Sequence, residues 1–310
     1  MVKRGLLILF SLFLVWGLIS GCGQAEPAVM PEQHDTDIPY GDHPLQTMDI
    51  HIPEGAKNAR YPVVLTLHGG EWLGGDKASM AYYTDTVLAA DCIHVNINYR
   101  LLNDGIPEDA AAPYEAMLDD IEAALSFLAE NAREYRIDTV KAGIAGYSSG
   151  GHLAMLYAYT RTAPPIPIRF VISEAGPANF LDPKTFTEDG EIWLHEGHEG
   201  HGDIEVWPGM AKDYRLAIIS DITGRAYGET GWEEAWAKAS PAFVVSDTAP
   251  KTYLFYGTHD SVVPISHGEL LEQNHPDCVL YEIIDGTHDL HTKSALESFQ
   301  AWLAEILQEF

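Results

Sequence analysis

The segment Gly146-Tyr147-Ser148-Ser149-Gly150 constrains the fold more than any other part of this sequence. The apolar run 140–145 before it has the length of a strand, and residues 153–160 after it have the spacing of a helix. Ser148 therefore falls at a strand-to-helix turn, where the flanking glycines let backbone segments approach closely. This position makes Ser148 a candidate nucleophile and makes the backbone N–H of Ser149 a candidate oxyanion donor.

The same pentapeptide is also typical of a simple glycine and serine turn that caps a helix. A nucleophilic role requires a base, an acid and a second oxyanion donor elsewhere in the chain. The rest of the sequence decides between the two interpretations.

Composition excludes some partners. The chain has 310 residues, 46% of them hydrophobic, which suffices for one large domain or two small ones. Its formal net charge of -28 repels nucleic acid and anionic membrane faces, so neither is expected as the main partner. The charge predicts a solvated acidic surface and does not specify a substrate.

The N-terminus has the features of a targeting segment. Lys3 and Arg4 precede the apolar run 6–19, which is short for a membrane span, and two small residues and Cys22 follow. This segment resembles a bacterial lipoprotein signal. The resemblance implies removal of residues 1–21 and a lipid on Cys22, which would hold an exported protein at the cell envelope, in contact with the membrane through its anchor only. An ordinary signal peptide and an uncleaved anchor are the alternatives.

Residues 22–37 are rich in Gly, Pro, Glu and Gln and have no periodicity, so they predict a flexible tether before a globular domain over 38–310. Cys92 and Cys278 each begin a predicted strand. If both strands lie in one open sheet, the two thiols are too far apart to bridge, and we expect them buried and free.

Predicted strands alternate with predicted helices along the globular part. This alternation indicates a mostly parallel sheet with helices on both faces, the α/β class. Residues 177–240 are longer than a connection between two core strands needs, and we expect a cap or lid insertion there. Strands are expected near 48–52, 63–67, 93–99, 140–145, 170–173, 252–256 and 279–284, and helices over 78–90, over 114–134 and from about 265.

Two polar residues follow the last two predicted strands. Asp260 comes after the strand near 252–256, and His288 comes after the strand near 279–284. The carboxyl ends of parallel strands meet at one edge of a sheet, so both residues are expected beside Ser148. The chain order Ser, Asp, His predicts His288 as general base and Asp260 as the residue that orients it, with an acyl-enzyme on Ser148 and no organic cofactor.

Each partner has an alternative. Asp260 could only cap the helix that follows it, because acidic side chains favour that position. His259, Asp285 and Asp289 lie within a few residues of the predicted acid and base and could take their place.

His68-Gly69-Gly70 ends the apolar run 63–67. Two glycines at this place let backbone N–H groups come close to a reacting oxygen, so Gly70 is predicted to share the oxyanion with Ser149. Gly69, Glu71 and Trp72 are predicted to contact the substrate. The alternative is a turn that only ends the strand.

The ordered set of motifs resembles the esterase and lipase branch of the α/β-hydrolases with an HGG oxyanion loop, especially bacterial feruloyl and acetyl-xylan esterases. The resemblance implies a serine carboxylic ester hydrolase for short or aromatic acyl esters, such as acetylated or feruloylated saccharides. Amide cleavage by the same residues and non-catalytic surface binding are the alternatives. Glu71 departs from the branch, which usually has a third glycine there. The motifs are His68-Gly69-Gly70, Gly74-Gly75-Asp76-Lys77, Asn98-Tyr99-Arg100, Gly146 to His152, Gly257 to Asp260 with Val263-Pro264, and Gly286-Thr287-His288.

Within the expected insertion, His195, His198 and His201 alternate with glycines and carboxylates. Three histidines with carboxylates suggest a divalent metal site. The glycines disfavour a helix, however, so the spacing does not place the rings on one face. A polar lid is therefore the preferred interpretation, and a metal site is the alternative.

Overall fold

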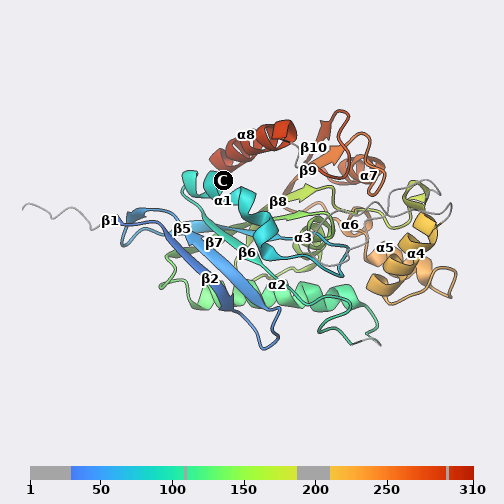
Figure 1. Cartoon of the computed structure of the whole chain (residues 1–310), viewed down its shortest axis with the longest axis horizontal. Coiled ribbons are helices and arrows are strands. Elements are labelled where there is room, and N and C mark those ends of the chain that lie inside the picture. Colours follow the sequence, from blue (N-terminus) through green and yellow to red (C-terminus); the bar gives the residue numbers. More distant parts are fainter. Residues whose placement is uncertain (1–28, 108–109, 187–209, 291–292) are drawn as a thin grey trace, which may run out of the picture.

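The computed structural model describes residues 29–107, 110–186, 210–290 and 293–310 (Figure 1). Its centre is an eight-stranded sheet in the order β10-β9-β8-β7-β5-β6-β3-β2, and a two-stranded sheet pairs β1 with β4. The strands are β1 (Val29–Met30), β2 (Gln33–Pro39), β3 (Thr47–Ile52), β4 (Gly55–Ala56), β5 (Tyr61–Leu67), β6 (Ile93–Ile97), β7 (Ile137–Tyr147), β8 (Ile168–Glu174), β9 (Lys251–Gly257) and β10 (Cys278–Ile283).

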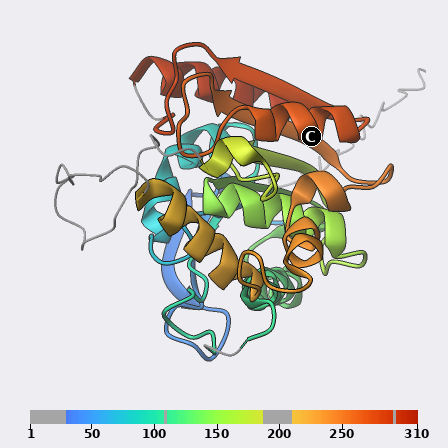
Figure 2. The same ribbon diagram turned by 90° about the vertical axis from the view of Figure 1, so that its right-hand side faces the viewer.

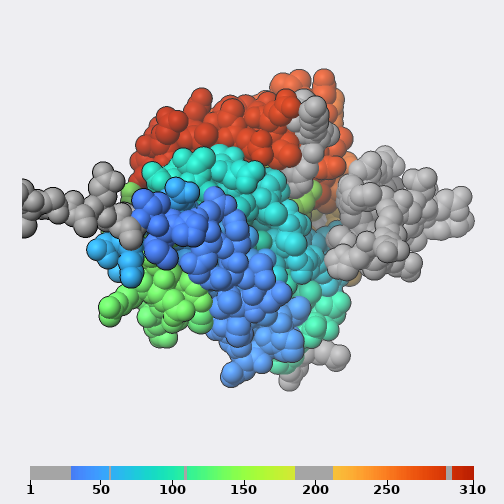
Figure 3. Space-filling view, turned by 60° about the vertical axis from the view of Figure 1, so that its left-hand side comes forward, coloured from blue at the N-terminus to red at the C-terminus, as the bar shows by residue number. Residues whose placement is uncertain are grey.

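Helices cover both faces of the large sheet. Residues of α2 and α3 join β5 and β7 in one apolar core, and residues of α1 and α8 join β8 and β9 in a second core. In the space-filling view of Figure 3, the red C-terminal residues, which include those of α8, lie above the cyan and blue residues of the N-terminal part of the chain. The helices are η1 (Lys77–Tyr83), α1 (Thr84–Ala89), α2 (Pro113–Glu130), α3 (Ser149–Thr160), η2 (Pro183–Phe186), α4 (Met210–Thr223), α5 (Trp232–Lys238), α6 (Pro241–Val244), α7 (Ser266–Asn274) and α8 (Lys293–Glu309).

The sheet is mostly parallel, as predicted. β5 to β10 run parallel to one another, while β3 pairs antiparallel with β6 and β2 pairs antiparallel with β3. The carboxyl ends of β5, β7, β9 and β10 therefore share one edge. Figure 2 views this side of the molecule, with α4, in gold, lying in front of the sheet.

The strand β2 corrects part of the predicted tether. Residues 29–30 and 33–37, expected to be flexible, belong to strands. Residues 29–30 form β1, which pairs with β4, and residues 33–37 belong to β2, which pairs with β3 from Gln33 opposite Ile52 onward. β2 is an edge strand whose side chains are mostly exposed, so it needs no apolar alternation. Its polar composition therefore resembles that of a linker. Residues 22–28 lie outside the described ranges.

Both described cysteines are free, as predicted. Cys92 is buried and Cys278 is half-buried. Four strands separate β6 from β10, which puts the two cysteines about 24 Å apart at about 4.8 Å per strand. Burial raises the pKa of each thiol to about 12, so both stay protonated at neutral pH.

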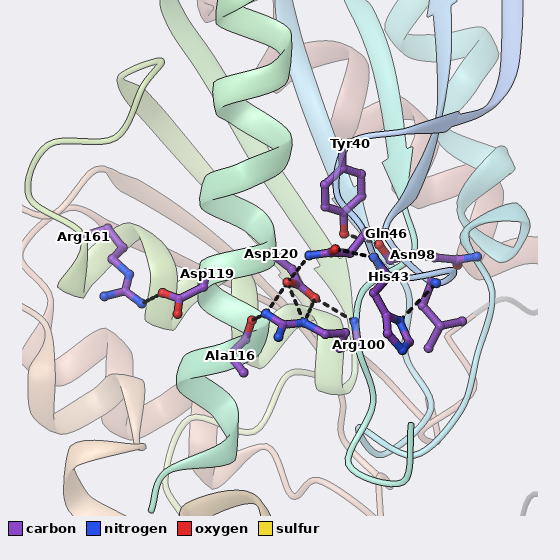
Figure 4. A network of polar contacts seen from close by, with 10 residues as sticks. Tyr40, His43, Gln46, Asn98, Arg100, Ala116, Asp119, Asp120 and Arg161 are labelled. Carbon is purple, nitrogen blue, oxygen red and sulfur yellow. Dashed lines mark hydrogen bonds and ion pairs between the residues drawn. The ribbon is translucent and has the colours of Figure 1, made fainter. Parts of the chain in front are cut away.

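A partly buried ion pair joins the segment after β6 to α2 (Figure 4). The Arg100 guanidinium donates to the carboxylate of Asp120, with Nη2 2.6 Å from Oδ1, and the Arg100 backbone N–H donates to Oδ2 at 2.8 Å. Gln46, from the turn before β3, adds a third donor at 2.7 Å. The Asp120 side chain is fully buried, so these donors replace the water that it loses.

Asp120→Ala is expected to lower the free energy of unfolding by about 3 kcal/mol or more, because it leaves the Arg100 charge without its buried partner. Urea denaturation measures the change. Asp119→Ala is the matched control, since Asp119 is 67% exposed and its ion pair with Arg161 contributes about 1 kcal/mol or less. Equal losses in the two variants would contradict this account.

None of the helices in the described ranges is both long enough and apolar enough to cross a membrane. The predicted signal segment, 1–21, and Cys22 lie outside those ranges.

Candidate active site

Ser148 lies at a strained turn between β7 and α3. Its backbone has φ 51° and ψ -120°, which is costly for a residue with a Cβ atom. The Ser148 N–H donates to the carbonyl of Glu174 at 2.7 Å, which fixes the turn against β8. A Cβ atom at Gly146 would lie 2.3 Å from Gly150, and one at Gly150 would lie 2.2 Å from the Leu67 carbonyl. The close approach predicted for both glycines is confirmed.

The structure brings Ser148, His288 and Asp260 together in one hydrogen-bonded array. His288 Nε2 lies 3.0 Å from Ser148 Oγ, and His288 Nδ1 lies 2.8 Å from Asp260 Oδ2. All three side chains are buried. The remaining Asp260 oxygen accepts the N–H groups of Val262 and Val263, each at 2.8 Å. Asp260 therefore caps the turn before α7 and also orients the imidazole.

The neighbouring candidates lie elsewhere. His259 and Asp285 face each other at 3.5 Å on the surface, with side chains 66% and 82% exposed. Asp289 is also exposed. Of the acids and histidines in these two loops, only Asp260 and His288 join Ser148 in the part of the chain that the structure describes.

The HGG loop lies directly beside Ser148. A Cβ atom at Gly69 would lie 2.8 Å from the Tyr147 ring and 3.2 Å from the Ser148 Cβ atom, so glycine favours this close approach. Gly70 has φ 122°, and its N–H makes no backbone hydrogen bond among the described residues. Ser149 is the first residue of α3, where an N–H has no partner within its own helix. Both amides are therefore available to an oxyanion at Ser148.

The segment after β6 contacts the HGG loop through Tyr99 and Asn98. The Tyr99 ring stacks on His68 at 4.4 Å, and its hydroxyl donates to the His68 carbonyl at 2.7 Å. Asn98 accepts the Lys77 N–H at 2.6 Å and donates to Asp76, at the end of the same loop. Burial lowers the pKa of His68 to about 4, so this ring stays neutral at the working pH of most enzymes.

Glu71 lies in the wall of the site. Tyr214, from α4, donates its hydroxyl to Glu71 Oε2 at 2.6 Å. Burial raises the pKa of the Glu71 carboxyl, while Tyr214, His288 and Arg215 act in the opposite direction. Glu71 lines the cavity beside Ser148, while its contact with substrate stays a prediction. Its partner on α4 was not predicted.

A cavity of about 50 Å³ adjoins Ser148. Glu71 and Trp72 form part of its wall, and α4 contributes Arg215 and two isoleucines. The cavity is mostly apolar; the two isoleucines are Ile218 and Ile219, and the other lining residues are Ser149, Pro177, Phe180, Thr185, Val262, Val263 and His267.

The predicted lid or metal histidines, His195, His198 and His201, lie outside the described residues. Within the described ranges, no three His, Cys, Asp or Glu side chains are placed to hold a metal ion together. Neither interpretation of the histidines is tested.

A family model described as BD-FAE matches residues 48–274, which include β3 to α7 with the nucleophile turn and Asp260. The chain belongs to the BD-FAE family. The match ends before His288. In this chain, His288 lies in the loop after β10, which follows the matched residues.

Two curated relatives illustrate the range of similar proteins. The chain is 25% identical over 235 residues to a probable isoprenylcysteine alpha-carbonyl methylesterase of Arabidopsis thaliana, covering 73% of this chain and 44% of the relative. It is 25% identical over 285 residues to a probable carboxylic ester hydrolase of Mycobacterium tuberculosis, covering 86% of this chain and 61% of the relative. The chain thus spans less than two thirds of either relative.

Solved structures show the α/β-hydrolase fold. One is a truncated carbohydrate esterase from gut microbiota, with TM-score 0.66, 18% identity, and coverage of 92% of this chain and 99% of that one. Another is esterase B from Lactobacillus Rhamnosis, with TM-score 0.65, 20% identity, and coverage of 90% and 86%. The predicted fold class is confirmed.

One contact beside Ser148, between Tyr147 and the loop that carries His288, was not predicted. The hydroxyl of Tyr147 donates to the backbone carbonyl of His288 at 2.9 Å, and the two rings lie 5.5 Å apart. The residue before the nucleophile thus holds the loop that carries the imidazole. Its place within the pentapeptide was visible in the sequence, but its partner lies 141 residues away.

Tyr147→Phe is expected to lower kcat about tenfold and to leave KM nearly unchanged, because a looser His288 loop misplaces the imidazole without altering the cavity. Steady-state kinetics on an active substrate measure both constants. Tyr227→Phe, at a side chain that is 56% exposed, is the control. A rise in KM with unchanged kcat would contradict the positioning role.

Proposed function

We propose that this protein is a serine-dependent carboxylic ester hydrolase that acts through an acyl-enzyme. The observation that carries the proposal is the array in which His288 bridges Ser148 at 3.0 Å and Asp260 at 2.8 Å. Core packing does not require a nucleophile, a base and an acid to meet at three separate strand ends, whereas acyl transfer does. Relatives named as esterases or ester hydrolases, over a shared domain, support the same class.

The chemistry follows from the geometry. His288 Nε2 takes the Ser148 proton as Oγ attacks the ester carbonyl, and Asp260 stabilises the imidazolium that forms. The N–H groups of Gly70 and Ser149 stabilise the tetrahedral oxyanion, where one such donor typically contributes about 3 kcal/mol. The imidazolium then protonates the leaving alcohol. Water, activated by the same imidazole, releases the acid and restores Ser148.

The cavity favours a small acyl group. Its volume of about 50 Å³ is a third of the roughly 150 Å³ of an apolar protein cavity that binds benzene. We therefore favour short acyl esters, such as acetyl esters, over feruloyl esters. A saccharide alcohol is a proposal supported by the fold shared with a carbohydrate esterase.

Ser148→Ala is expected to reduce kcat for p-nitrophenyl acetate by about 10⁴-fold or more, since it removes the atom that forms the acyl-enzyme. Thermal unfolding should show a folded protein, because alanine fits a buried position. Ser246→Ala, at an exposed serine, is the control. Substantial hydrolysis by a folded Ser148→Ala variant would refute the proposal.

We also propose that the protein is an exported lipoprotein anchored through Cys22. The support is the sequence alone: a positive start, a short apolar run and small residues before the cysteine. Cys22→Ala should move the protein from the membrane fraction to the soluble fraction of cells that express the full chain. Cys92→Ala is the control, since Cys92 is buried in the fold. Membrane retention of Cys22→Ala would contradict the proposed anchor.

A further inference from the structure

Glu71 occupies a backbone conformation that suits glycine. Its φ is 53°, between Gly70 at 122° and Trp72 at 60°. A side chain with a Cβ atom is strained in this region, so its presence has to be offset by contacts. The hydroxyl of Tyr214 supplies one such contact at 2.6 Å, and joins the oxyanion loop to α4.

Trp72 is fixed on the other side of the strained segment. It is buried, and its ring lies edge-on to His152 at 5.3 Å and to Phe180 at 5.8 Å. The loop is therefore held at both residues, by Tyr214 through Glu71 and by aromatic packing through Trp72. Glu71 has a fixed place in the cavity wall.

The cavity receives the acyl part of an ester. The leaving alcohol has to take its proton from His288 Nε2, so it lies on the imidazole side of Ser148. His288 is not among the described residues that line the cavity, whereas Ser148 and the oxyanion residue Ser149 are. The acyl chain thus extends from Ser148 toward Glu71 and α4.

We propose that Glu71 is a specificity-determining residue that limits the acyl group to acetyl size. The inference rests on the proposed ester hydrolysis and adds the residue that sets the substrate limit. The Glu71 side chain fills space that a glycine would leave open, beside a cavity of only about 50 Å³. Its carboxyl also presents a polar surface to any longer apolar chain, which would remove water from that group without offering a hydrogen bond.

Arg215 is a second charged residue in the cavity wall. Its guanidinium donates to the carbonyls of Thr185 and Ser261, both at 2.8 Å, so the charge is held in place on α4. Glu71 and Arg215 are the acidic and basic residues of a lining that is otherwise mostly apolar. On this proposal, an acetyl methyl group fits in the cavity, and further methylenes would have to displace or contact these charged side chains.

The test compares kcat/KM for p-nitrophenyl acetate, butyrate and hexanoate. The wild-type protein should prefer acetate. Glu71→Gly should lower the acetate to butyrate ratio by about tenfold or more through a gain on butyrate, since each methylene admitted to a pocket changes kcat/KM by about 10-fold or more. Glycine also relieves the positive φ, so this variant is expected to fold. Glu71→Gln, which keeps the length of the side chain, should retain the acetate preference.

Tyr214→Phe provides a second variant, which leaves the sequence of the oxyanion loop unchanged. It removes the hydrogen bond that holds the Glu71 carboxyl, so the acetate to butyrate ratio should fall in the same direction by a smaller factor. Asp213→Asn, at an exposed residue of α4, controls for changes to that helix.

Three outcomes would overturn the inference: a wild-type preference for butyrate or hexanoate, an unchanged ratio in an active Glu71→Gly variant, or loss of all activity in Glu71→Gly with an unchanged ratio in Tyr214→Phe. Failure of the proposed function has a different signature. In that case the wild-type protein cleaves none of the three esters, or Ser148→Ala cleaves them equally well.

Discussion

The hydrogen bond between Ser148 and His288 depends on a backbone turn that is costly to hold. Ser148 sits at φ 51° because β7 ends there and α3 begins at the next residue. The sheet offsets this cost through the contact of Ser148 with Glu174 on β8 and through glycines that admit the Leu67 carbonyl. The parallel register then places the loops after β9 and β10 within reach of the nucleophile.

The oxyanion loop also contains a strained backbone that contacts from elsewhere in the fold hold in place. Gly70, Glu71 and Trp72 have positive φ in succession, and such a loop would relax without external contacts. Tyr99 stacks under His68, while Tyr214 holds Glu71 from α4. The site is therefore preorganised by contacts from both the sheet and the insertion, so that little reorganisation is needed when charge develops on the oxyanion.

The sequence predicted the features that local patterns determine. Apolar runs placed the parallel strands, and the order of Ser148, Asp260 and His288 placed the three side chains at one edge. It failed at β2, whose exposed edge position needs no apolar residues. It also gave no sign of the bonds from Tyr147 to His288 or from Tyr214 to Glu71, because partners 141 and 143 residues apart are chosen by the folded chain.

The most direct measurement is covalent labelling of the native protein with a phosphonate ester, followed by mass spectrometry of its peptides. A phosphonate reacts with an activated serine and stops at a tetrahedral adduct, so it reports the nucleophile whatever the natural ester is. We expect one adduct, on Ser148, and none in His288→Ala, where the base is missing. Labelling at another serine, or equal labelling of Ser148 without His288, would contradict it.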